Sequence, residues 1–452
     1  MKQTGPVRGR RAKLAGVAGA LSLALAGTMM GGAAAAKTSG EPAAVPEHKN
    51  MRIVAQNDLG GNGNGGEGFG EVKTHDGRRI LYVAHESGPK CFSVVDVTNE
   101  KHPVLLRQTD VPDAHTRCNS LDVSGKLLVV ANQVEKPGQP NAGMRVYDIS
   151  HPTRPRQVAF FDTSGPDSRG AHYVWMNDGR YVHMSTGMPD FHPRRPEKDD
   201  QIYVVVDLRR PSKPKEAGRW WMPGTRVGDK APLPKPNTRV DDGCRVHNVD
   251  VVRQSPGRAY LGYIDCGVVE LDISNPHHPR MIAHKDDSPP QVGFTHTVWP
   301  LHGGRYLFVT HESDQDNCAD APKPDTIWAN HGKRGPRQIA TVPMPRNAAD
   351  LCKRDGRFGA HNVFEAPDDE PVFRSQKIML TSFFNGGVRA YDVSDPAHPR
   401  EVAYNIPPAP SGGDLNASQI NDVYVDDRGA IFAVDRFSGG LYVLRSPLVR
   451  GR

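Results

Sequence analysis

The stretch Leu271-Asp272-Ile273-Ser274-Asn275-Pro276-His277-His278-Pro279 contains a pattern that returns along most of the chain. An apolar or aromatic residue, an aspartate and a β-branched residue or leucine are followed by two prolines three positions apart. Further copies are Tyr147-Asp148-Ile149 with Pro152 and Pro155, Val206-Asp207-Leu208 with Pro211 and Pro214, Tyr391-Asp392-Val393 with Pro396 and Pro399, and Val95-Asp96-Val97, which keeps only Pro103.

The spacing of these copies gives the period of the repeat. Gly440 stands where a glycine precedes several of the aspartates by five residues, so it predicts a degenerate copy at Arg445. One copy is missing between Asp272 and Asp392. The six intervals from Asp96 to Arg445 then average about 58 residues, and seven modules of this length nearly fill the chain.

Each module is predicted to form four short antiparallel strands. Proline lacks the backbone donor that a strand needs, so the two prolines end the third strand and precede the fourth. Such modules at a fixed period are typical of propeller blades. The sequence predicts an all-β, seven-bladed β-propeller, with Met51 to Ala55 as the missing fourth strand of the last blade. Six or eight blades are the alternatives, because the copy near residues 327 to 346 is irregular; two stacked sheets explain neither the period nor the matching ends.

The repeat resembles the LVIVD-repeat family of extracellular β-propeller proteins, and the resemblance covers nearly all of the chain after its leader. It implies the fold and export more than an activity.

The formal charge of +6 comes mostly from the first 36 residues, which carry five basic and no acidic side chains. These residues read as a signal peptide, with a cationic start, a short apolar run and small residues before a cleavage site near Ala36. We expect a secreted or extracytoplasmic protein with a linker at residues 37–50 and one propeller domain at residues 51–452. We expect no nucleic-acid partner and no membrane span, because the basic stretches are interrupted and the apolar run is short.

All six cysteines lie after the predicted leader. An even number in an oxidising compartment permits up to three disulfides, although sequence alone cannot choose among the 15 pairings. We favour the local pairs Cys244–Cys266 and Cys318–Cys352, with buried free thiols as the alternative.

One position, at the start of the first strand of each module, carries histidine in four consecutive modules. These first strands lie nearest the axis of a propeller, so the four imidazoles should meet in the central channel, as a transition-metal site requires. The residues at this position are Glu71, Asn119, His172, His247, His296, His361 and Asn421. We predict His172, His247, His296 and His361 as ligands of Fe, Cu or Zn; a polar, hydrogen-bonded channel lining is the alternative.

A second group of side chains is predicted to surround this ring. The second strands end in His85-Glu86-Ser87 and His311-Glu312-Ser313, close to the same face. Carboxylates could accept the second ring N–H of a ligand histidine and so fix its tautomer; the candidates are Glu71, Glu86, Glu312 and Asp422. His115 and His183 should lie near the face but away from the ring.

The glycine-rich run at residues 60–70 contains Gly-x-Gly-x-x-Gly fragments without a strand-turn-helix unit around them, so nucleotide binding is not indicated. We expect a flexible loop before the first blade, over the ring face, where it could act as a lid.

The arrangement resembles that of metal-dependent propeller oxidoreductases, such as the carotenoid-cleavage oxygenases and the selenium-binding or methanethiol oxidase type. This resemblance implies metal-dependent oxidation of a small molecule. We expect the protein to be a monomer. A hydrolase is less favoured, because no Gly-x-Ser-x-Gly elbow occurs in a strand-to-helix context. The alternative from another class is a non-catalytic extracellular scaffold that recognises a protein or glycan.

Overall fold

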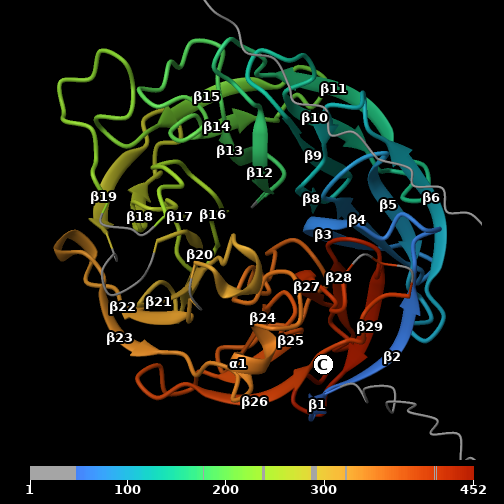
Figure 1. The fold of residues 1–452 in the computed structure, drawn as a ribbon. Coiled ribbons are helices and arrows are strands. Elements are labelled where there is room, and N and C mark those ends of the chain that lie inside the picture. The colour runs from blue at the N-terminus through green and yellow to red at the C-terminus, as the bar shows by residue number, and fades with distance from the viewer. Residues whose placement is uncertain are drawn as a thin grey trace, which may run out of the picture. The chain divides into compact units, whose positions relative to one another are not determined.

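A computed structural model describes residues 47–451 except 177, 237–239, 287–292, 321–322, 412 and 414. The predicted signal peptide at residues 1–36 lies outside the described residues. The described residues form seven antiparallel sheets arranged as the blades of a β-propeller, which confirms the predicted fold. In Figure 1 the inner strands surround the centre of the ring and the outer strands, such as β6, β11 and β26, form its rim.

The strands run outward in chain order in blades 1 to 5, whereas the outermost strand of blades 6 and 7 comes from the N-terminal side. Blade 1 contains β3 (Gly65–Lys73), β4 (Arg79–His85), β5 (Lys90–Asp96) and β6 (Val104–Asp110). Blade 2 contains β7 (Thr116–Arg117), β8 (Leu121–Ser124), β9 (Leu127–Val134), β10 (Gly143–Asp148) and β11 (Arg156–Asp162). Blade 3 contains β12 (Ala171–Met176), β13 (Tyr181–Thr186), β14 (Ile202–Asp207) and β15 (Lys215–Trp220).

The remaining blades follow the same plan. Blade 4 contains β16 (Val249–Asp250), β17 (Arg258–Gly262), β18 (Val268–Asp272) and β19 (Arg280–Lys285), and blade 5 contains β20 (Thr295–Leu301), β21 (Tyr306–His311), β22 (Thr326–Ala329) and β23 (Arg337–Thr341). Blade 6 contains β24 (Ile378–Ser382), β25 (Val388–Asp392), β26 (Arg400–Asn405) and β1 (His48–Lys49). Blade 7 contains β27 (Ile420–Val425), β28 (Ile431–Asp435), β29 (Leu441–Arg445) and β2 (Arg52–Asn57).

The repeated aspartate ends the third strand of five blades and stabilises the turn that follows this strand. The Asp272 carboxylate accepts a hydrogen bond from the backbone N–H of Ser274 at 3.0 Å, and Asp392 accepts one from Ser394 at 3.0 Å. This local bond replaces a ladder bond, and the next strand begins directly after the second proline. In blade 5 the aspartate is absent, and Asn330 accepts from Gly332 at 2.9 Å instead.

The two ends of the described chain close the ring. β2 pairs antiparallel with β29, with Ile53 opposite Leu444, so the last blade takes its outer strand from the N-terminal side as predicted. The short β1 adds to the outer edge of β26, with His48 opposite Asn405. The described propeller therefore begins before residue 51, and the last residues of the predicted linker belong to blade 6.

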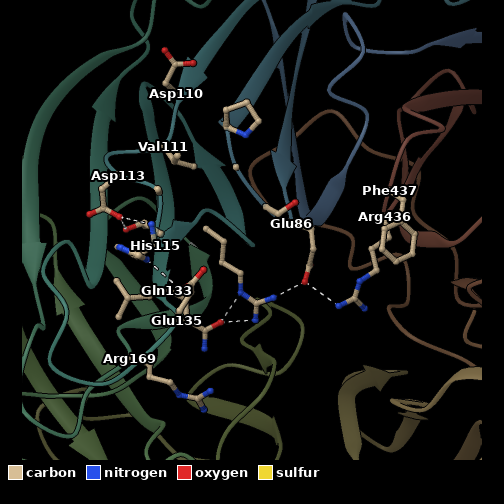
Figure 2. Close-up of a pocket in the computed structure, with 17 residues that line it drawn as sticks. Glu86, Asp110, Val111, Asp113, His115, Gln133, Glu135, Arg169, Arg436 and Phe437 are labelled. Carbon is tan, nitrogen blue, oxygen red and sulfur yellow. Dashed lines mark hydrogen bonds and ion pairs between the residues drawn. The ribbon is translucent and has the colours of Figure 1, made fainter. Parts of the chain in front are cut away.

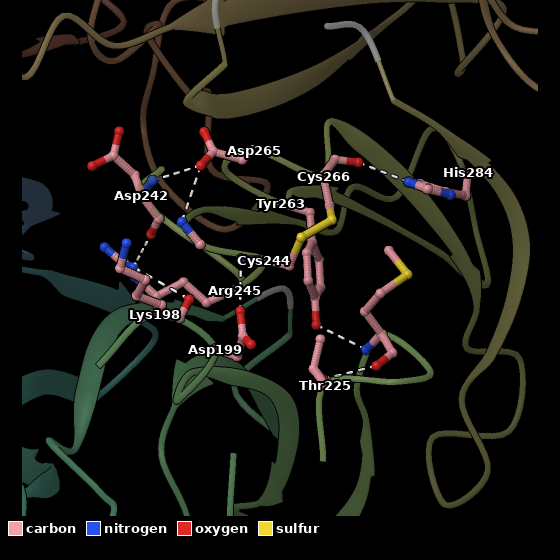
Figure 3. The surroundings of a disulfide bond; sticks show 12 residues. Lys198, Asp199, Thr225, Asp242, Cys244, Arg245, Tyr263, Asp265, Cys266 and His284 are labelled. Carbon is pink, nitrogen blue, oxygen red and sulfur yellow. Dashed lines mark hydrogen bonds between the residues drawn. A yellow bond between two sulfur atoms is a disulfide. The ribbon is translucent and has the colours of Figure 1, made fainter. Parts of the chain in front are cut away.

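Three disulfides join all six cysteines. Cys244–Cys266 and Cys318–Cys352 are formed as predicted, and Cys91–Cys118 joins blade 1 to blade 2. Figure 3 shows the Cys244–Cys266 bond beside Arg245 and Asp265 in blade 4.

In the residues that the structure describes, helices are short and lie in connections between strands. The structure contains α1 (Ala348–Leu351) and the 3-10 turns Asp316–Cys318 and Gly332–Arg334. Among the described residues, no helix has the length and apolar character needed to cross a bilayer.

Removal of β2 should open the ring. A chain that begins at Asp58 lacks the partner of β29, which leaves an unpaired strand edge. We expect a lower thermal unfolding midpoint than for a chain beginning at Glu47, and oligomers in size-exclusion chromatography. Equal midpoints and equal elution for the two chains would show that β2 does not close the fold.

The bond between blades 1 and 2 should contribute measurably to stability. Cys91 and Cys118 are separated by 27 residues, and a loop of this size corresponds to a loss of about 2–4 kcal/mol when the bond is removed. Urea unfolding of the Cys91→Ala/Cys118→Ala variant should show this loss. The unreduced parent protein is the reference, and an unchanged free energy of unfolding contradicts the expectation.

Candidate metal centre

The four predicted histidines lie side by side in the channel. His172 and His296 are the second residues of β12 and β20, His247 directly precedes Asn248 and β16, and His361 lies in an inner segment of blade 6 whose backbone N–H donates to Ser382 at 3.0 Å. Their side chains are buried. Successive imidazole centroids are 4.3, 3.9 and 4.3 Å apart. The predicted convergence of these side chains is therefore present.

At His172 and His296, a bulge in the inner strand turns the side chain toward the axis. In β12, Ala171 and Tyr173 pair with consecutive residues of β13, so His172 is the extra residue; His296 lies within a similar irregularity of β20. An extra residue of this kind redirects a side chain and interrupts the ladder locally. Asn421 of β27 occupies the same kind of position in blade 7. In blades 3, 5 and 7 the ring position thus coincides with a bulge in the inner strand.

Each imidazole is held through Nδ1, which leaves Nε2 facing its neighbours. His361 Nδ1 donates to the backbone carbonyl of Asn421 at 2.6 Å, which puts the lone pair on Nε2. The other three Nδ1 atoms contact side-chain oxygens of Gln133 (from His172, 3.0 Å), Asn248 (from His247, 2.9 Å) and Thr297 (from His296, 2.8 Å). An N–H held in this way fixes the tautomer that a metal requires.

Two glutamates face the same Nε2 atoms. Glu67 Oε2 lies 3.6 Å from His296 Nε2, and Glu67 Oε1 lies 3.6 Å from His361 Nε2. Glu312 Oε1 lies 3.7 Å from His361 Nε2. His172 Nε2 and His247 Nε2 are 3.0 Å apart. We call the four histidines with Glu67 and Glu312 the histidine–glutamate cluster.

The donor atoms of the histidine–glutamate cluster fit a metal ion. Three overlapping groups have their donor atoms within 4.8 Å of one another, and each combines two histidines with one glutamate. The groups are Glu67-His296-His361, Glu67-His172-His247 and His247-His296-Glu312. Imidazole and carboxylate together suit Fe, Zn and related ions.

Several of these atoms have no hydrogen-bond partner although they are buried. They are Glu67 Oε2, His296 Nε2 and His361 Nε2. A buried polar atom without a partner costs about 1–3 kcal/mol, and three such atoms face one space here. A bound cation would satisfy all three at once. The unpartnered donor atoms of the cluster are therefore compatible with a bound metal ion.

The pKa shifts of three of the four histidines also suit metal binding. Burial lowers the pKa of His247 to about 3 and lowers the pKa of His172 and His296 as well, so these imidazoles are neutral donors. Burial would raise the pKa of Glu312, but the charges of His361 and Arg357 outweigh it and lower the pKa to about 2. Burial opposes the charged form of His361, yet the charges of Glu67 and Glu312 raise its pKa.

The other predicted residues divide between the cluster and its surroundings. Asn119 Nδ2 donates to Glu67 at 3.0 Å and Asn421 contributes its carbonyl, so both support the cluster. Glu86 accepts hydrogen bonds from Arg117 and Arg436 outside it. Glu71 contacts Arg79 at 2.5 Å, and Asp422 Oδ1 accepts from Val423 at 2.8 Å.

Four further histidines are held by other contacts. His85 contacts Asn64 and Ser93, and His311 contacts Thr326. His183 contacts Tyr203 at 2.7 Å, and the exposed His115 contacts Glu135 at 3.2 Å. The structure does not bring these four into the cluster.

The expectation that carboxylates receive the second ring N–H is not what the structure shows. The partners of Nδ1 are amide, hydroxyl and carbonyl oxygens, whereas Glu312 faces Nε2. The reason is the strand register: a side chain one residue along, as in Asn248 and Thr297, already reaches Nδ1.

Glu67 is the residue that the sequence analysis missed. The expected ring residue of blade 1 was Glu71, but the irregularity in β3 between Gly65 and Phe69 brings Glu67 to the cluster. Residues 65–70 are also part of β3 and not a flexible loop. A Cβ on Gly66 would lie 2.3 Å from the Asn119 carbonyl oxygen and one on Gly68 2.4 Å from the Leu121 nitrogen, so the glycines permit close approach of blade 2. In the sequence, the signal that could have identified Glu67 was its position as the single glutamate within a glycine-rich run.

A further group of carboxyl side chains, which we call the channel carboxyls, consists of the buried Asp122, Asp250 and Asp422 and the half-buried Glu365. Glu365 accepts hydrogen bonds from the Tyr173 hydroxyl and from Asn248 Nδ2, the latter at 3.0 Å. Burial raises the pKa of Glu365 to about 7 against the lowering effect of these bonds, and burial raises the pKa of the other three well above the usual value.

Comparisons with known proteins agree with the fold. Residues 256–287 match the LVIVD repeat family, which confirms that resemblance for the segment containing the stretch at 271–279. The β-propeller domain of Myceliophteria thermophila Cps50 (Swd1) is similar over 87% of this chain and 99% of that chain, at 13% identity and a TM-score of 0.52. U3-55K is similar over 87% of this chain and 98% of that chain, at 11% identity and a TM-score of 0.51. No curated protein matches the sequence. Identities this low support the fold alone.

The channel carboxyls should make stability depend on pH. Because the pKa of Glu365 is higher in the folded than in the unfolded chain, its contribution is present below its unfolded pKa and is lost as pH rises through about 7. We therefore expect Glu365→Gln to flatten the fall in the free energy of unfolding between pH 5 and pH 8, measured with urea at each pH. The exposed Glu135→Gln is the control; identical slopes for both variants and the parent would contradict this account.

Proposed function

We propose that the protein is an extracytoplasmic metalloprotein that binds a transition metal ion at the histidine–glutamate cluster and oxidises a small molecule there. The observation that carries the proposal is the meeting of buried, unpartnered Nε2 and carboxylate atoms in one space. Export is supported by the predicted leader and by three disulfides, which persist in oxidising compartments.

The residues of the chain have distinct parts in this proposal. The four histidines, Glu67 and Glu312 would hold the ion, and the oxygens on Nδ1 would keep each imidazole in the donor tautomer. A transition metal in this site would supply redox and Lewis-acid chemistry to a bound small molecule. Buried Phe294, whose ring centroid is 5.7 Å from that of His247, would keep water from one side.

A cavity of about 300 Å³ gives access to the cluster. Its lining includes His172, His247, Glu67 and Glu312, and we call it the vestibule. A small molecule in the vestibule would therefore lie beside the donor atoms. This access separates the proposal from a purely structural metal site, which is closed.

The metal proposal is tested by elemental analysis. Protein purified without an affinity tag should contain near-stoichiometric Fe, Cu or Zn, and His247→Ala should lose most of it because it removes a ligand from two of the three donor groups. His115→Ala, at an exposed histidine, is the matched control and should keep the metal.

Unfolding midpoints of both variants complete the experiment. A folded His247→Ala variant that retains the metal of the parent, or a parent without any of these metals, would favour the non-catalytic scaffold.

A further inference from the structure

The vestibule has arginines around its opening. Five of them, from five different blades, contribute to its lining: Arg117, Arg169, Arg245, Arg357 and Arg436. Arg117 and Arg245 precede Asn119 and His247 by two residues, and side chains two apart on an extended segment point to the same face. The repeat thus places guanidinium groups next to the metal ligands, toward the solvent.

Two pairs of these arginines each share one oxygen acceptor. Arg169 Nη2 and Arg245 Nη1 donate to the Glu197 carbonyl at 3.0 and 3.2 Å. Like charges brought this close favour an anion between or beside them.

The second pair already holds a carboxylate. Arg117 and Arg436 both donate to Glu86 Oε1, the latter at 3.0 Å. Figure 2, which draws the lining of the larger cavity next to the vestibule, shows Glu86 and Arg436 directed toward each other. Arg117 Nη2 lies 3.4 Å from His172 Nδ1, so this pair lies directly beside the metal ligands. The place is therefore suited to a carboxylate by charge and by geometry.

Carboxylates already pair with several of these arginines. Glu312 Oε1 accepts a hydrogen bond from Arg357 at 2.7 Å and lies 4.0 Å from Arg436 Nη1. Glu67 and Glu312 also face the histidines and would neutralise a bound cation. Arg169 is paired with Asp200 at 2.7 Å. Glu86 remains as the main counter-ion of Arg117 and Arg436.

A larger cavity continues outward from the vestibule. It has a volume of about 1160 Å³ and shares Glu86, Arg117, Gln133, Arg169 and Arg436 with it. Its wall also includes Pro89, Val111 and Val134, and the half-exposed Phe437. An organic molecule of moderate size fits this cavity, with an apolar part against this wall.

We propose that the ligand of the vestibule is a small organic anion, whose acid group binds the arginines of blades 2, 3 and 7 while its remainder extends into the larger cavity. The proposal rests on the function proposed above and names its substrate class. The acid group would take a position beside or in place of the Glu86 carboxylate, between Arg117 and Arg436.

Benzoate and its neutral amide, benzamide, are the probes, measured by isothermal titration calorimetry on the full chain with its native metal content and again after chelation. We expect benzoate to bind at least about tenfold more tightly than benzamide, because the two differ in charge and not in size. Arg436→Gln should weaken benzoate binding by about tenfold or more, whereas Arg209→Gln, in the turn after β14 and outside both cavities, should leave it unchanged.

The Glu86→Gln variant should change the affinity for benzoate in the opposite direction. It removes the carboxylate that competes for Arg117 and Arg436, so benzoate should bind more tightly to this variant, a result that misfolding cannot produce. Equal affinity for the two probes, no benzoate binding at millimolar concentration, or no effect of Arg436→Gln would overturn the proposal.

The failure of the two proposals is distinguishable in the same experiment. Arginine-dependent benzoate binding by protein that contains no metal as purified, before chelation, would refute the metalloprotein and support the anion site. Stoichiometric metal together with equal binding of both probes would do the reverse.

Discussion

The start of the innermost strand, which is bulged in blades 1, 3, 5 and 7, is the constraint on which the site depends. In a closed ring the inner strands lie at similar distances from the axis, so a residue at one repeat position meets its counterparts from other blades. The extra residue in β12, β20 and β27 turns that side chain toward the axis. In blade 1 the same kind of irregularity delivers Glu67. Closure by β2 and the Cys91–Cys118 bond hold the blades in this arrangement.

The chemistry of the channel follows from burial. Away from water, an imidazole remains neutral and a carboxylate needs a positive partner. The histidine–glutamate cluster provides neutral nitrogen donors and two carboxylates that face them, whereas the channel carboxyls have no such partners and their pKa values are raised. Arginines near the opening form a third zone. The proposed order from solvent inward is thus an anion-binding entrance, a metal site and a proton-bearing group of carboxyls.

Much of the fold could be predicted because it is encoded locally. The aspartate and the two prolines determine a turn through bonds between residues two apart, as in Asp272 and Ser274, so each copy can be recognised without its neighbours. The four histidines could be predicted for the same reason, since they occupy one position of the repeat. Glu67 could not, because the irregularity in β3 changes the count from the second strand, and counting led to Glu71. The side chains that contact Nδ1 could not be predicted either. Gln133, for example, comes from another blade, and its contact with His172 Nδ1 depends on the strand register.

The most direct test of the account is anomalous diffraction from crystals of the protein, recorded at the absorption edge of the metal found by elemental analysis. The account predicts a peak among the four Nε2 atoms, about 2.0–2.2 Å from at least two of them and from an oxygen of Glu67 or Glu312. A channel with no anomalous peak, or a peak only at surface histidines such as His115, would contradict it.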